Sequence, residues 1–207
     1  IEREKGFRSN VTLQQKIWLS NHDDIEDDVF EYLESQITDP LNIEYSNESE
    51  EFAQEAIIAI MNGGEVDFTL QIILDPSFKN NPRLKCIWVK INSGNNTIND
   101  YLQNFKPEFS VAHLRFKNDV NFSSNQPSDH WTAGAITMPP NNYIIDIIVN
   151  SDPSLSSSSQ NFPTIIVALE IIHETIHAEM FRKLMECAGL PHVNFNSMTE
   201  TQWVDFM

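Results

Sequence analysis

Apolar residues recur at spacings of three and four through much of the first hundred positions, as they do along helices that bury one face. This pattern predicts helices over residues 11–19, 23–37, 47–61, 84–91 and 98–105. Asn47 with Glu50 three positions later resembles a capping box at the start of the third helix, and Gly63 follows its end. The N-terminal half is therefore expected to be mainly helical.

The pattern changes after Pro107. In residues 111–116, Ala, Leu and Phe alternate with Val, His and Arg. This period of two predicts a strand with one buried face. Residues 143–149 are rich in isoleucine and are interrupted only by Asp146, which predicts a second strand near a sheet edge. The polar stretches 118–129 and 150–160 are expected to be loops.

Pro163 is placed to open a long helix over residues 164–187, and this helix contains His173, Glu174 and His177 in the pattern HExxH. Residues four apart lie on one helical face, so both imidazoles can reach one zinc ion at about 2.0 to 2.1 Å. Glu174 projects beside the two histidines, in the position of a general base toward water at the metal. The motif therefore predicts a zinc centre.

An apolar stripe on the same helix is expected to form core and to hold the histidines at the border between core and cleft. Its members are Ile165, Leu169, Ile172, Ile176 and Met180.

Charge and composition narrow the function classes. The 207 residues include 13 basic and 30 acidic side chains, a net charge of -17 that disfavours nucleic acid and anionic membrane surfaces as partners. The apolar runs are too short to span a bilayer, so no membrane insertion is expected. Cys86 and Cys187 lie far apart and form no metal knuckle, and both are expected to be buried free thiols. A peptide or protein substrate fits this composition better than nucleic acid or a membrane does. The oligomeric state is left open.

The chain begins with Ile1 rather than Met, which leaves the compartment open and is compatible with a removed signal sequence. Secreted or cell-surface placement is slightly favoured over cytoplasmic.

The segment 171–178, preceded by an isoleucine-rich strand and a polar loop, resembles the zincin metallopeptidases, most closely their SprT-like and other compact gluzincin-type members. The resemblance covers about residues 111–187, and only HExxH is specific. It implies an α+β fold with helices on a small mixed β-sheet and an edge strand lining the cleft. It also implies that His173 and His177 are zinc ligands and that Glu174 is catalytic.

The third zinc ligand is left open. Met180 stands where a metzincin needs glycine and Lys183 where it needs its third histidine, while Ser197 stands near the place of a thermolysin-like glutamate. His192 follows His177 by a spacing similar to that of the third histidine in SprT-like proteins. The alternatives are Glu200, Asp205 and a ligand beyond Met207, in a chain truncated at its C-terminus.

Other candidate side chains receive simpler interpretations. His113, on a strand face, and His130, in a loop, are expected to be structural or solvated histidines. Glu179 is expected to point away from the metal, as a surface charge or as a contact behind the ligands.

The chain is thus expected to divide into a helical region over residues 1–106, acting as scaffold or regulator, and a zincin-like metallopeptidase domain over 107–207. The leading hypothesis is a zinc-dependent endopeptidase, one module of a longer bacterial protein, with the peptide extended along the strand at 143–149. The alternatives are a zincin-fold binding module with weak or no catalysis, and a helical domain whose HExxH is accidental.

Overall fold

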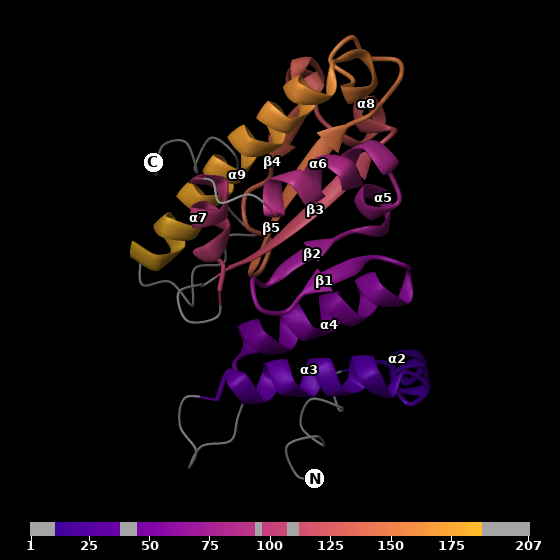
Figure 1. The fold of residues 1–207 in the computed structure, drawn as a ribbon, viewed down its shortest axis with the longest axis vertical. Coiled ribbons are helices and arrows are strands. Elements are labelled where there is room, and N and C mark those ends of the chain that lie inside the picture. The colour runs from indigo at the N-terminus through magenta and orange to yellow at the C-terminus, as the bar shows by residue number, and fades with distance from the viewer. Residues whose placement is uncertain (1–10, 38–44, 94–96, 107–111, 188–207) are drawn as a thin grey trace.

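A mixed five-stranded sheet lies at the centre of the protein (Figure 1), and the computed structural model describes residues 11–37, 45–93, 97–106 and 112–187. The strand order is β1-β2-β3-β5-β4, with β2, β3 and β5 parallel and with β1 and β4 antiparallel to their neighbours at the two edges. The expected α+β class with a mixed sheet is confirmed. The strands are β1 (Glu65–Asp67), β2 (Ile72–Leu74), β3 (His113–Asp119), β4 (Ala135–Thr137) and β5 (Ile144–Asn150).

The helices predicted in the N-terminal half are present as α2, α3, α4, α6 and α7, and the long helix α9 begins after Pro163 as expected. The short helices α5 and α8 and two 3-10 turns, at Ser128–Thr132 and Ser159–Asn161, were not predicted. The helix bounds are α2 (Leu13–Leu19), α3 (Asp23–Ser35), α4 (Asn47–Met61), α5 (Pro76–Lys79), α6 (Pro82–Asn92), α7 (Thr97–Gln103), α8 (Phe122–Asn125) and α9 (Thr164–Cys187).

The capping box expected at Asn47 is wrong by one residue. Ser46 caps α4, because its backbone is extended and its side chain accepts a hydrogen bond from the Ser49 amide at 3.1 Å. Asn47 already belongs to the helix, so it lacks the extended backbone that an N-cap needs.

The two faces of the sheet bury different cores. On β2, Ile72 and Leu74 face a large core shared with α6, α7 and α9, whereas Ile73 faces a second core under α3 and α4. In Figure 1, α4 and α3 are stacked below β1, and α9 lies beside β4 and β5 at the other end of the sheet. The sheet and its larger core thus use residues from both sides of the boundary expected at residue 107.

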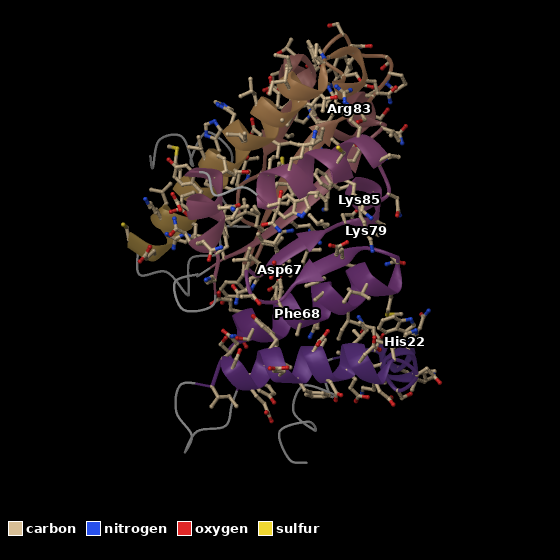
Figure 2. All side chains as sticks on the ribbon, viewed as in Figure 1. His22, Asp67, Phe68, Lys79, Arg83 and Lys85 are labelled. Carbon is tan, nitrogen blue, oxygen red and sulfur yellow. The ribbon has the colours of Figure 1, made fainter. Side chains whose placement is uncertain are left out.

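Arg83 of α6 anchors the segment that leads into α9. Its guanidinium donates to the carbonyl oxygen of Ser159 at 2.6 Å and to that of Phe162, directly before the helix begins (Figure 2 labels Arg83 on α6). The polar stretch 150–160 is therefore a loop held by hydrogen bonds. Within it, the Ser151 and Ser159 hydroxyls lie 2.7 Å apart. Within the described ranges, no helix is both long and apolar enough to cross a membrane.

The strands predicted at 111–116 and 143–149 correspond to β3 and β5, but the edge position expected for the second is wrong. β5 lies inside the sheet, between β3 and β4. Asp146, the polar residue that suggested an edge, accepts hydrogen bonds from two side chains of the neighbouring strand: Arg115 at 2.6 Å and Lys117 at 2.8 Å. Cross-strand pairing thus accommodates a carboxylate at an interior position.

The Asp146 pairing gives a stability test of this strand order. We expect Asp146→Ala to lower the free energy of unfolding by about 1 to 3 kcal/mol, because two half-buried cations lose a charged partner. Urea unfolding measures the change, with Asp24→Ala on the exposed side of α3 as the control. Equal effects of the two substitutions would contradict an interior β5.

Candidate metal centre

His173 and His177 lie one turn apart on α9 and turn their rings toward each other. Their Nε2 atoms are 2.9 Å apart, the ring centroids are 4.6 Å apart, and the planes meet at 80°. Two nitrogens bound to one zinc in tetrahedral geometry would be about 3.3 Å apart, so a small adjustment accommodates the ion. His173 is exposed and His177 half-buried, which leaves the pair open to solvent.

Glu174 lies beside this pair in a more protected position. It is 7% exposed, and the hydroxyl of Thr137 on β4 lies 2.7 Å from its Oε2 and 2.8 Å from its backbone carbonyl oxygen. Burial raises the pKa of the Glu174 carboxyl, while the Thr137 hydrogen bond and the nearby histidines oppose the increase. A carboxylate with a raised pKa is a better proton acceptor than an exposed one.

Strand β4 supplies the other wall of the site. It pairs only with β5 among the described strands, and α9 packs against both. Ala135 faces the core under α9, whereas Ile136 faces a small cluster on the opposite side of the sheet. Sequence reasoning missed both β4 and Thr137, because three residues between polar segments carry no measurable periodicity.

The apolar stripe predicted to be core on α9 is wrong. Ile165 is 65% exposed and Leu169 53%, while Ile176 and Met180 are exposed and Ile172 is half-buried. The helix is apolar on both sides, so periodicity could not show which side meets the sheet. The buried side instead contains Val167, Ile171, Ala178, Phe181 and Met185.

Glu179 is buried, not the surface charge that was one of its two expected roles. Its side chain is 3% exposed, and Oε2 accepts from Arg182 Nε at 2.7 Å. Its Oε1 accepts from the Asn104 amide at 2.9 Å, just beyond α7. Glu179 thus connects α7 to α9, on the side of α9 away from the histidines.

Among the described residues, two histidine side chains are placed so that both could bind one metal ion, and no third candidate lies beside them. In these parts of the chain, no group of three or more His, Cys, Asp or Glu side chains is placed to hold a metal ion. His192, Glu200 and Asp205 lie outside the described residues, so their assignment, like that of a ligand beyond Met207, stays a prediction. Two imidazole nitrogens are donors of the kind that zinc binds, and the Glu174 carboxylate lies beside them without being one of the donors.

The expected burial of the two thiols is wrong, because Cys86 and Cys187 are both free and exposed. Cys86 lies on the solvent side of α6, whose buried positions are Leu84, Ile87, Trp88 and Ile91.

His113 has the structural environment expected of it. It is fully buried on β3, with Nε2 3.1 Å from the carbonyl oxygen of Glu48 and Nδ1 3.1 Å from Oε1 of Gln71. Burial lowers its pKa to about 3, which keeps the ring neutral. His130, the other histidine set aside, is half-buried in the turn at Ser128–Thr132.

Comparisons with models of known protein families, with curated proteins and with solved structures find no match for this chain.

The His113 environment predicts a pH dependence of stability. A histidine whose pKa is lowered on folding stabilises the folded state only while it is neutral, so that contribution is lost as the pH falls below about 6.5. We expect wild type to lose about 1.2 kcal/mol of stability relative to His113→Gln between pH 6 and pH 5. Urea unfolding at each pH measures the difference. A slope of the opposite sign would mean that His113 is charged between its two oxygen neighbours.

Proposed function

We propose that this chain is a zinc-dependent metallopeptidase of the zincin type, in which His173 and His177 hold the metal and Glu174 is the general base. The main support is the approach of the two histidine Nε2 atoms to 2.9 Å beside a buried, hydrogen-bonded Glu174. The resemblance implies helices on a small mixed sheet with an edge strand lining the cleft, and the antiparallel edge strand β4 beside the HExxH helix supports it. The third ligand comes from His192, Glu200, Asp205 or the chain beyond Met207.

In the proposed reaction, the metal would act as Lewis acid and Glu174 of α9 transfers the proton. Bound zinc would supply a Lewis acid that polarises the scissile carbonyl and lowers the pKa of water. Glu174 takes the proton of the attacking water, and its raised pKa suits that task. The same carboxyl then donates the proton to the leaving amide nitrogen. The hydrogen bond from Thr137 holds the carboxylate against β4, next to the turn of α9 that carries the histidines.

The substrate adds to β4 rather than to β5. Both edges of β5 are occupied, by β3 and by β4, so the path expected along residues 143–149 is closed. The outer edge of β4 has no strand beside it among the described residues. A peptide that pairs with this edge runs along α9 and carries its scissile bond past the two histidines.

Substitutions on α9 test the assignment, with zinc content and cleavage of unstructured peptides as the two measurements. We expect His173→Ala and His177→Ala to lose both bound zinc and activity, because each removes a ligand. Glu174→Gln should retain zinc and lose about 10²- to 10⁴-fold in kcat, because the general base is gone. His130→Ala is the matched control and should change neither measurement.

Two outcomes separate the alternatives. Zinc retained by a wild type that cleaves no peptide would favour a binding module, which the presence of only two ligands among the described residues supports. Absence of bound zinc, together with no thermal shift on its addition to the protein, would contradict both metal hypotheses.

A further inference from the structure

The face of α9 that surrounds the histidines is exposed and mostly apolar. Ile166 and Leu169 precede His173 on this face, and Ile176 and Met180 follow it, all four exposed. Glu170 is the acidic residue at the border between this face and β4, about 20° from His177 and about 40° from Glu174 round the helix. It is therefore the charged group that a peptide on β4 meets next to the two histidines.

Among the described residues, no basic side chain is bonded to the Glu170 carboxylate. It is half-buried, and its side chain forms no hydrogen bond or ion pair with another described residue. The Glu170 side chain lies against Gly134, the residue before β4, where an added Cβ would be 3.3 Å from the Glu170 Cγ. Glu170 and Glu174 are four residues apart on α9, and like charges at that spacing repel each other. A cation beside Glu170 would relieve that repulsion.

We propose that Glu170 selects a lysine or arginine side chain of the peptide, about two residues from the scissile bond. This inference rests on the proposed peptidase function. Along the helix axis Glu170 lies about 4.5 Å before His173 and about 10.5 Å before His177, a mean of about 7.5 Å. At about 3.3 Å per extended residue, that offset corresponds to about two residues of substrate.

The alternation of an added strand determines which substrate positions meet α9. Ala135 faces the core under α9 and Thr137 bonds Glu174, so α9 covers this face of β4. Alternate side chains of a strand beside β4 point toward the same helix. One of them meets Glu170 and its neighbours on that face meet Ile166 or Leu169. The preferred substrate is therefore an extended, basic and apolar segment.

The net negative charge of the chain also favours binding of basic peptides. With 30 acidic and 13 basic residues, the protein attracts cationic peptides over long range. The basic residues Lys79, Arg83 and Lys85 lie on α5 and α6 (Figure 2), not on the exposed face of α9.

Peptides that differ at one position test the selection. Unstructured peptides carrying Lys, Met or Glu at each position within three residues of the scissile bond are assayed for kcat/KM with wild type, Glu170→Gln and Glu170→Lys. We expect wild type to prefer Lys to Met at one position by about tenfold or more, and less so at high salt. Glu170→Gln should abolish the preference, and Glu170→Lys should transfer it to Glu. Asp24→Asn, which removes a charge on α3, should leave it unchanged.

A binding measurement separates failure of this inference from failure of the proposed function. Fluorescence anisotropy records affinity for the Lys and Met peptides in Glu174→Gln and in Glu170→Gln/Glu174→Gln. No cleavage by wild type, with Lys-selective binding that requires Glu170, would overturn the peptidase and support the selection. Cleavage by wild type, with the same Lys preference in folded, zinc-containing Glu170→Gln, would overturn the selection and leave the peptidase intact.

Discussion

The hydrogen bond between Thr137 and Glu174 is the contact on which the candidate site depends, because it joins the edge strand β4 to the HExxH helix. It holds the Glu174 carboxylate on the side of α9 that faces the strand. The two histidines lie at neighbouring angles round the same helix. One contact thus brings Glu174, the turn of α9 with the two histidines and the edge strand β4 together.

The contacts that fix α9 in this orientation lie away from the histidines. Buried Glu179 and Arg182 connect the helix to Asn104, and Arg83 bonds the turn before its first residue. Because these bonds are on the core side and at the N-terminal end, the opposite side remains exposed although it is apolar. This exposed apolar face beside the two imidazoles is where the proposed peptide would lie.

Local features were predictable from the sequence, and contacts between distant segments were not. The helices and the spacing of His173 and His177 depend on residues within a few positions of one another, and periodicity identified them. Three-residue strands such as β4 have no period to detect, so Thr137 and the edge strand itself were missed. The buried side of α9 was misassigned because Leu169 and Ile171 are equally apolar, and only the sheet decides between them.

The proposed chemistry requires that the two imidazoles of α9 bind one zinc ion. X-ray absorption at the zinc edge, on the full chain loaded with one equivalent of Zn²⁺, measures the ligands directly. We expect imidazole nitrogens at about 2.0 to 2.1 Å from the zinc, and their loss in His177→Ala. A zinc shell of oxygen ligands alone, unchanged in that variant, would contradict it.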